Sequence, residues 1–180
     1  MDILVIFGVI ILSAVVIEYF IKKERSKKLK DETAKITDQL KELHERCKET
    51  MIRAEQGDAK SQLSISINYR YGSSGLNQNN MEAIKWLRKS VEQGYAPAET
   101  ELGERYMEGD GLLQDYNEGI KWLQKAAAQG DARAQYYLGK AYEEGKGVVI
   151  DYNEAVGMYK KAAEQGVPGA LEWFKNHDKH

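Results

Sequence analysis

The side chains that most often catalyse reactions or bind metal ions are few in this chain of 180 residues. Its histidines are His44, His177 and His180, and the last two belong to a polar run, His177-Asp178-Lys179-His180. Imidazole and carboxylate groups on a solvated, frayed terminus bind a metal ion only weakly. The single cysteine, Cys47, excludes an intramolecular disulfide and a multi-cysteine metal site. We therefore predict no metal centre and no bound cofactor.

Glycine pairs and candidate nucleophiles also lack the context of a catalytic site. Two Gly-x-Gly pairs, at 109/111 and 145/147, have neither the preceding strand nor the following Lys-Ser/Thr pair of a phosphate loop. No serine, cysteine or lysine stands in a recognisable nucleophile motif. The sequence therefore predicts turn positions for these glycines, no catalytic residues, and a binding protein rather than an enzyme.

The charge of the chain is close to balanced, with a net value of -2. Residues 22–56 hold eleven Lys and Arg against eight Asp and Glu, and residues 57–180 hold fifteen against eighteen. Nucleic-acid-binding proteins concentrate positive charge on one face to neutralise phosphates. We therefore predict no nucleic-acid partner.

Residues 3–21 read ILVIFGVIILSAVVIEYFI and carry one charge, Glu18. A helix of this length spans roughly 28 Å, close to the roughly 30 Å apolar thickness of a bilayer. A secretory signal peptide carries its positive charges before the apolar core, whereas here six Lys and Arg follow it, between Lys22 and Lys30. We therefore predict that residues 1–21 are an uncleaved transmembrane anchor of the bacterial inner membrane. By the positive-inside rule its amino terminus lies outside and the following residues lie in the cytoplasm.

Residues 22–56 predict a basic juxtamembrane segment and a connecting helix. Between Leu29 and Ala54, apolar or small residues recur at alternating intervals of four and three, namely Leu29, Thr33, Ile36, Leu40, Leu43, Cys47, Thr50 and Ala54. This is heptad spacing. Two interpretations are open: a short coiled coil that makes a weak homo-oligomer, or one long helix whose stripe packs against the domain that follows. We favour the second, with Cys47 as a small apolar residue of that stripe.

The remainder of the chain repeats itself. Gln-Gly pairs occur at 56/57, 93/94, 129/130 and 165/166, with spacings of 37, 36 and 36 residues. A fixed period of this length is typical of a solenoid. The period divides the chain into residues 57–94, 95–130 and 131–166, followed by residues 167–180. At an offset of 36 the second and third units agree at Ala96/Ala132, Ala98/Ala134, Leu102/Leu138, Gly103/Gly139, Tyr106/Tyr142, Gly109/Gly145 and Gly111/Gly147.

Each unit has the pattern of a helical hairpin. In the second unit, Ala98, Leu102 and Tyr106 form one apolar stripe, and Gly109 follows it, where a left-handed cap is expected. Asp115 precedes Glu118 by three residues, an acidic counterpart of the capping box at the start of the second helix. The third unit repeats this pattern with Asp151 and Glu154. The residues predicted to face inward on the second helices are Ile120, Leu123 and Ala127, then Val156, Tyr159 and Ala163.

These motifs resemble the Sel-1-like repeat family, a short relative of the tetratricopeptide repeat. The third unit follows the family pattern almost throughout, from Ala132 through Gly145 and Lys161 to Gly166, with Met158 where the pattern has Trp. The first unit is degenerate, and its Ser-Ile-Ser-Ile-Asn stretch has low helix propensity. The resemblance implies an all-α fold, in which a right-handed α/α solenoid of three hairpins ends in a capping helix within residues 167–180.

The same resemblance implies a scaffold or adaptor that binds another protein or peptide through a concave face lined by the first helices. The residues of these helices outside the apolar stripe are the candidate contacts: Glu101, Glu104, Arg105, Glu108, Tyr137, Lys140 and Glu144. This mixed, rather acidic set favours a basic or amphipathic peptide. Two alternatives are open: a small accessory subunit of a membrane complex that acts through residues 3–21, or an envelope-facing modulator of another protein.

Overall fold

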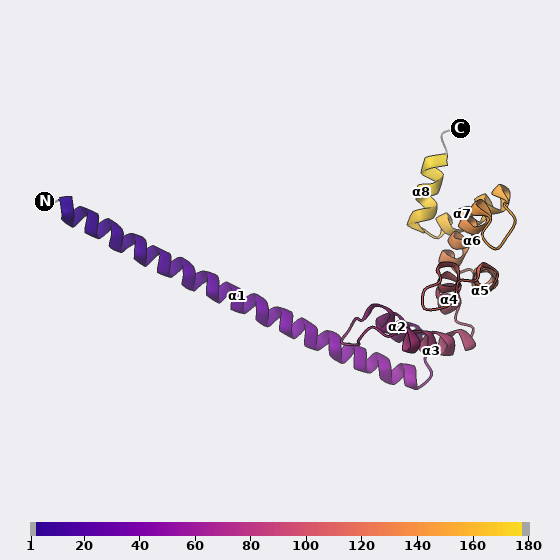
Figure 1. The fold of residues 1–180 in the computed structure, drawn as a ribbon, viewed down its shortest axis with the longest axis horizontal. Helices are drawn as coiled ribbons and strands as arrows, with labels where there is room; N and C mark the ends of the chain where they lie inside the picture. The colour runs from indigo at the N-terminus through magenta and orange to yellow at the C-terminus, as the bar shows by residue number, and fades with distance from the viewer. Residues whose placement is uncertain (1–2, 178–180) are drawn as a thin grey trace. The chain divides into compact units, whose positions relative to one another are not determined.

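The computed structural model describes the backbone of residues 3–177 and the side chains of residues 22–177. The described backbone is all-α, as predicted, and contains eight helices (Figure 1). Their bounds are α1 Ile3–Glu55, α2 Ala59–Tyr71, α3 Asn80–Glu92, α4 Ala96–Glu108, α5 Tyr116–Ala128, α6 Ala132–Glu144, α7 Tyr152–Glu164 and α8 Pro168–His177. The contacts within the chain divide it into two compact units, Met1–Arg46 and Cys47–His180.

The first unit consists of most of α1, a helix of 53 residues that runs on into the second unit. The apolar segment and the connecting segment therefore belong to one helix. It contains no proline, and it ends before Gly57, whose φ is 101°. Among residues 22–177, no helix is long and apolar enough to cross a membrane. The predicted span, residues 3–21, lies outside the residues whose side chains are described.

The second unit is a stack of three helical hairpins, α2–α3, α4–α5 and α6–α7, followed by α8. The first helix of each hairpin ends at a glycine in the left-handed region, Gly72, Gly109 or Gly145, with φ values of 64°, 74° and 70°. The cap predicted for Gly109 and Gly145 is thus confirmed.

The second helices begin at the predicted aspartates, but the capping box is only half formed. Asp115 Oδ1 accepts a 3.1 Å hydrogen bond from the Glu118 amide, and Asp151 Oδ1 accepts one of 3.1 Å from Glu154. The reciprocal bond is absent, because the Asp115 amide donates to the Tyr106 carbonyl at 2.9 Å. This backbone bond closes the turn between the two helices, so Glu118 is free to pair with Lys121 instead.

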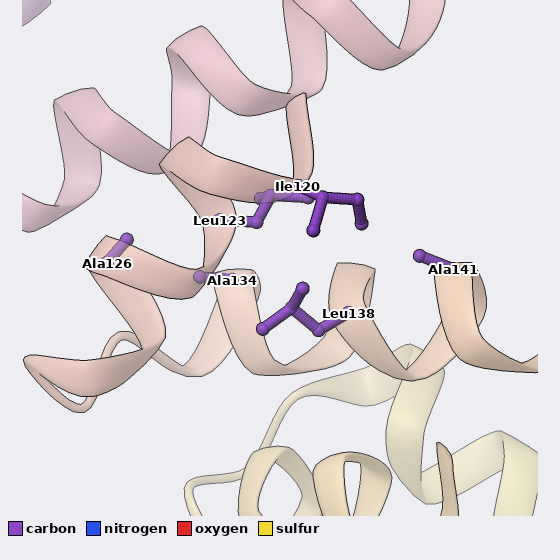
Figure 2. Packing of buried hydrophobic residues seen from close by; sticks show 6 residues of the cluster. All are labelled: Ile120, Leu123, Ala126, Ala134, Leu138 and Ala141. Atoms are coloured by element: carbon purple, nitrogen blue, oxygen red, sulfur yellow. The ribbon is translucent and has the colours of Figure 1, made fainter. Parts of the chain in front are cut away.

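Small residues allow the helices of a hairpin to approach closely. A Cβ atom on Gly103 would lie 2.8 Å from Leu123 Cγ, and one on Gly139 would lie 2.9 Å from the Tyr159 ring. Figure 2 shows how successive hairpins join, with Ile120, Leu123 and Ala126 of α5 facing α6. The α6 residues in this cluster are Ala134, Leu138 and Ala141.

The inward face of the second helices differs slightly from the prediction. Val156 was expected inside but is 40% exposed, whereas Ala155 is fully buried. The core positions near the helix ends are Ala126 and Ala162, and the predicted Ala127 and Ala163 are only partly buried. The buried face therefore follows residues 155, 159 and 162, since a helix places positions four and three apart on one side.

A glutamine at the end of each second helix bonds back to the first helix of its own hairpin. The Nε2 atom of Gln93 donates to Gln62 Oε1 at 2.7 Å, and that of Gln165 donates to Gln135 Oε1 at 2.9 Å. In the middle hairpin, Gln129 Nε2 donates to a glutamate, Glu99 Oε2, at 2.6 Å. These are the glutamines of the Gln-Gly pairs, so the sequence period marks a repeated structural contact.

The two ends of the stack are covered by α1 and α8. Cys47 and Ala54, near the end of α1, are buried against Ile65 and Trp86 of the first hairpin. The second interpretation of the heptad stripe therefore holds for its last part, residues 47–54. At the other end Ala170 of α8 is fully buried, as expected for a capping helix.

Candidate functional site

A small groove lies between the first helices of the second and third hairpins. Its volume is about 190 Å³. Five of the seven predicted contact residues line it, namely Glu104, Glu108, Tyr137, Lys140 and Glu144. Three further residues that the sequence did not single out complete the lining: Met107, Ala141 and Lys146.

The three additional residues give the groove an apolar floor and a second cation. Met107 is partly buried against the α5–α6 core and offers apolar surface, whereas Ala141 is 1% exposed and closes the groove from the core side. Lys146 lies between the turn glycines Gly145 and Gly147. Sequence reasoning missed it because a turn of unknown path does not show which helix its side chains reach.

Glu101 and Arg105 do not line the groove but lie inside the stack. Glu101 is 4% exposed and Arg105 is completely buried. Arg105 Nε donates to Glu101 Oε1 at 3.1 Å, and Arg70 Nη1 of α2 donates to the same oxygen at 2.8 Å. Buried charges persist only where partners replace water. These two predicted contact residues are thus held in a structural network between the first two hairpins.

Arg105 is incompletely satisfied in this network. Its Nη2 atom lies 3.5 Å from Ser66 Oγ, and within the described residues its Nη1 atom has no hydrogen-bond partner. Arg70, by contrast, also contacts Asp110 at 2.5 Å and Glu108 at 3.6 Å. The buried carboxylate of Glu101 is thus shared by Arg70 and Arg105, and Arg133 Nη2 lies 3.9 Å from its Oε2 atom.

Glu104 lies at the inner edge of the groove and is 5% exposed. Its Oε1 atom contacts Arg133 Nη2 at 2.5 Å. Burial raises the pKa of Glu104 to about 7, and the nearby carboxylates of Glu101 and Glu108 add to the increase, while Arg133 and a hydrogen bond with Tyr137 oppose it. Glu104 is therefore a carboxyl group whose charge responds to pH near neutrality.

The rest of the groove combines anionic and cationic groups at its rim. Burial, with the neighbouring charge of Glu104, raises the pKa of Tyr137 to about 12, so its hydroxyl stays protonated. Glu144 and Lys146 form an ion pair at 2.6 Å, and this hydrogen bond lowers the pKa of Glu144. Three carboxyl groups against two ammonium groups around an apolar floor suit a peptide that carries a positive charge beside an apolar side chain.

The described residues offer no arrangement for metal chemistry. Within residues 22–177, no group of three or more His, Cys, Asp or Glu side chains could hold a metal ion. The His177 ring stacks on Trp173 with 4.2 Å between centroids, and His180 lies outside the described residues. Burial raises the pKa of the Cys47 thiol, which disfavours the reactive thiolate.

Solved structures of bacterial proteins share this fold. A protective antigen of uropathogenic Escherichia coli that displays an SLR fold is 38% identical, with a TM-score of 0.65. The match covers 72% of this chain but only 29% of that protein, so the present chain spans less than a third of its length. A Sel1 repeat protein from Oxalobacter formigenes is also 38% identical, with a TM-score of 0.63, over 71% of this chain and 96% of that one.

A more distant structure supports the fold alone. Cysteine-rich protein B of Helicobacter pylori is 24% identical, with a TM-score of 0.56, and the match covers 74% of this chain and 95% of that one. No curated protein matches the sequence. The profile of the Sel1 repeat matches residues 58–95, 96–131 and 132–167, which is more than half of the chain. With three consecutive matches and a stack of three hairpins, this chain belongs to the Sel1 repeat family.

Proposed function

We propose that this chain is a membrane-anchored scaffold that binds a basic, amphipathic segment of another protein in the groove between α4 and α6. The observation that carries the proposal is the lining of this groove, where Glu104, Glu108 and Glu144 lie around the partly exposed apolar side chain of Met107. Sel1 repeats as a class serve protein binding, which supports this proposal.

The volume and the charges of the groove indicate which kind of ligand it would bind. A volume of about 190 Å³ is smaller than the roughly 300–1,000 Å³ of a typical small-molecule pocket, so it suits one side chain of a longer segment. The apolar floor would take that side chain, and Lys or Arg residues beside it would approach Glu108 and Glu144. Because Glu108 is well exposed, its contribution is a screened, salt-dependent attraction rather than a strong fixed contact.

Anchoring is the second part of the proposal and is supported by the sequence. Residues 3–21 have the length and apolarity of a span, and the lysines and arginine after them favour the cytoplasmic side for the repeats. We propose that the protein is a single-pass protein of a bacterial inner membrane with its repeats in the cytoplasm.

Peptide binding tests the groove directly. Fluorescence anisotropy would compare a Lys/Leu amphipathic peptide with a Glu/Leu peptide of the same length and pattern. We expect the basic peptide to bind at least about tenfold more tightly, and the preference to weaken with salt and with Glu108→Lys. Glu164→Lys, the same charge reversal at an exposed position of α7, is the matched control. Equal affinity for both peptides, or no effect of Glu108→Lys, would show that this groove is not the binding site of the basic peptide.

A photo-crosslinker then identifies the natural partner in cells. It would replace Tyr137 in the groove, and a matched control would replace Tyr152, which is 64% exposed at the start of α7. One defined protein should be captured from position 137 but not from position 152, and the basic peptide should compete with it. Capture from both positions would indicate nonspecific contact.

Topology is best probed at a surface position, because Cys47 is only 7% exposed. Lys35→Cys in a Cys47→Ala background places an accessible thiol on α1. The proposed orientation predicts no labelling by a membrane-impermeant maleimide in intact cells and full labelling after lysis. Labelling of intact cells would place the repeats outside the cytoplasm.

A further inference from the structure

A second groove is lined by residues of α5, α6 and α7, and none of its described lining residues belongs to the groove between α4 and α6. Its volume is about 270 Å³. Tyr142 and Met158 are partly buried and offer apolar surface, while Leu138 closes the groove from the core side. Lys161 is the one charged side chain among the described lining residues. The others are Gln124, Ala127, Ala128 and Gln135.

The third repeat lacks an indole ring that the first two repeats have at this place. Trp122 stands 36 residues before Met158, and Trp86 stands another 36 residues before it. Trp122 packs against a core cluster made by α3 and α4, and Met158 packs in the same way against the cluster made by α5 and α6. The methionine side chain is narrower than an indole, so it fills less of the space between neighbouring hairpins.

Two alanines on α5 widen this space further. Ala127 and Ala128 occupy the places that Val91 and Glu92 have on α3, one repeat earlier. The wall of the groove that faces α7 therefore carries smaller side chains than its counterpart facing α5. The open volume follows from these local substitutions, since the backbone plan of the hairpins is the same.

A lysine follows each of the three positions by three residues. Lys89 Nζ lies 4.1 Å from the centroid of the Trp86 ring, and Lys125 Nζ lies 5.2 Å from that of Trp122. An ammonium group within about 6 Å of an aromatic face is attracted by the ring. Lys161 has this place in the third repeat, but Met158 offers it no ring.

Lys161 also lacks the carboxylate that its counterpart has. Lys125 Nζ contacts Glu99 Oε1 at 2.6 Å. In the third repeat the place of Glu99 is taken by Gln135, whose Oε1 atom accepts a 2.9 Å hydrogen bond from Gln165. Among the residues whose side chains the structure describes, none forms an ion pair with Lys161.

The two missing groups define the chemistry of a ligand. An aromatic ring in the groove would lie against the Met158 thioether, a favourable contact for sulfur, and near the Lys161 ammonium. A carboxylate beside the ring would pair with that ammonium. A volume of about 270 Å³ is below the roughly 300–1,000 Å³ of a typical small-molecule pocket, so it suits one side chain of a longer segment.

We infer that the groove lined by α5, α6 and α7 binds a tryptophan side chain next to an acidic residue in a segment of a partner protein. Tryptophan is favoured over the other aromatic residues because its ring attracts a cation most strongly. The inference does not depend on the basic-peptide groove between α4 and α6, since the two grooves have different lining residues and opposite charge.

Peptide binding to the full chain tests the ligand class. Fluorescence anisotropy would compare three peptides of one length whose central residues are Glu-Trp-Glu, Gln-Trp-Gln and Glu-Ala-Glu. We expect the first peptide to bind at least about fivefold more tightly than either of the others, because these lack the carboxylates or the ring. Equal affinity of the Glu-Trp-Glu peptide and either other peptide would overturn the inference. So would the absence of binding up to about 1 mM.

Variants of the groove test the place of binding. Met158→Trp supplies the chain's own indole where the first two repeats have theirs, so it should weaken binding of the Glu-Trp-Glu peptide at least about tenfold. Met81→Trp, the same substitution at a position of α3 that is 83% exposed, is the matched control and should have no effect. Lys161→Gln should remove the preference for Glu-Trp-Glu over Gln-Trp-Gln. Undiminished binding by Met158→Trp would overturn the inference.

Methyl NMR of the wild-type chain gives a test that needs no folded variant. With the methionine methyl groups labelled, the Met158 resonance should move upfield when the tryptophan ring of the peptide stacks on it. The Met107 methyl group, in the groove between α4 and α6, should not respond. A shift of Met107 without a shift of Met158 would place the peptide in the other groove and contradict the inference.

Discussion

The Gln129 side-chain amide lies 2.6 Å from Glu99 Oε2 and donates a hydrogen bond to a carboxylate that is completely buried. Lys125 Nζ contacts the other carboxylate oxygen of Glu99 at 2.6 Å. In the neighbouring hairpins the same place is occupied by a neutral glutamine pair, Gln93 with Gln62 and Gln165 with Gln135. The middle hairpin therefore depends on its glutamine more than the others do, because hydrogen bonds to a buried charge are stronger.

Removal of the Gln129 amide should destabilise the fold. Gln129→Ala leaves Glu99 with one partner fewer in the interior, and we expect the free energy of unfolding to fall by about 1–3 kcal/mol. Urea denaturation followed by circular dichroism measures this change. Gln124→Ala, at an exposed position of the same helix, is the control and should have little effect. Equal stabilities of the two variants would show that the Gln129 bond contributes nothing.

Two glycine substitutions should have opposite effects on stability. A methyl group on Gly103 would lie 2.8 Å from Leu123 Cγ and 3.0 Å from the Gly119 carbonyl oxygen, so Gly103→Ala must push α4 and α5 apart. We expect a loss of about 1–3 kcal/mol. Gly157 lies inside α7 with nothing within 4 Å of the added atom, so Gly157→Ala should stabilise the protein by about 0.5–1 kcal/mol. Thermal denaturation of both variants would check the two signs, and a destabilising Gly157→Ala would contradict the packing described for α7.

Stability should fall as the pH rises from about 5 towards 7.5. The pKa of Glu104 is raised to about 7 in the folded chain, from 4.5, so between these values the folded state binds a proton that the unfolded state has released. The contribution is complete below 4.5 and is lost as the pH passes through 7, with a total of about 1–3 kcal/mol. Glu144 and Asp58, whose pKa values are lowered, lose their contributions at more acidic pH and do not interfere.

Urea denaturation at pH 5.5 and pH 7.5 measures this dependence. Glu104→Gln should make the stability nearly independent of pH across the interval, and Glu108→Gln, at an exposed position, should leave the dependence unchanged. A Glu104→Gln variant with the wild-type slope would assign the titration to another group.

The two partners in the buried pair of Arg105 and Glu101 should differ in their importance. Arg105→Met fills similar space with an apolar side chain, removes a guanidinium whose Nη1 atom has no partner in the described chain, and leaves Glu101 paired with Arg70. We expect a change within about 1 kcal/mol of zero. Glu101→Met leaves Arg105 and Arg70 without their shared carboxylate and should cost about 3–5 kcal/mol. Chemical denaturation of the two variants checks the asymmetry, and equal losses would contradict it.

Most of the repeat architecture could be predicted from the sequence, because its signals are local. Gly109 and Asp115 act within a few residues of themselves, and their roles as caps follow from backbone geometry alone. The spacing of the Gln-Gly pairs also predicted the hairpins, because one interval of 36 or 37 residues holds one helical hairpin. The bond from the Asp115 amide to the Tyr106 carbonyl was missed, since nothing in the side chains of these residues specifies a backbone contact.

The candidate groove was predicted only in part, because burial of charged residues depends on neighbouring hairpins. Glu101 and Glu104 have similar positions on one helix, yet Glu101 is enclosed by Arg70 from α2 and Glu104 borders the groove beside Arg133 of α6. No spacing within α4 distinguishes them. The membrane span and its orientation remain predictions that the topology experiment addresses.

The arginine pairs at the two junctions give the three repeats a fixed order. Arg70 reaches from α2 to Glu101 and Glu108, and Arg133 reaches from α6 to Glu104 and, at 3.9 Å, to Glu101, so α4 presents glutamates to both neighbours. At the corresponding places the third repeat has Tyr137 and Lys140. If the second and third repeats exchanged places, Arg70 would face a tyrosine at the place of Glu101 and lose its buried carboxylate partner. The three repeats therefore share one backbone fold, but the side chains at their junctions differ, so each repeat fits only its own position in the stack.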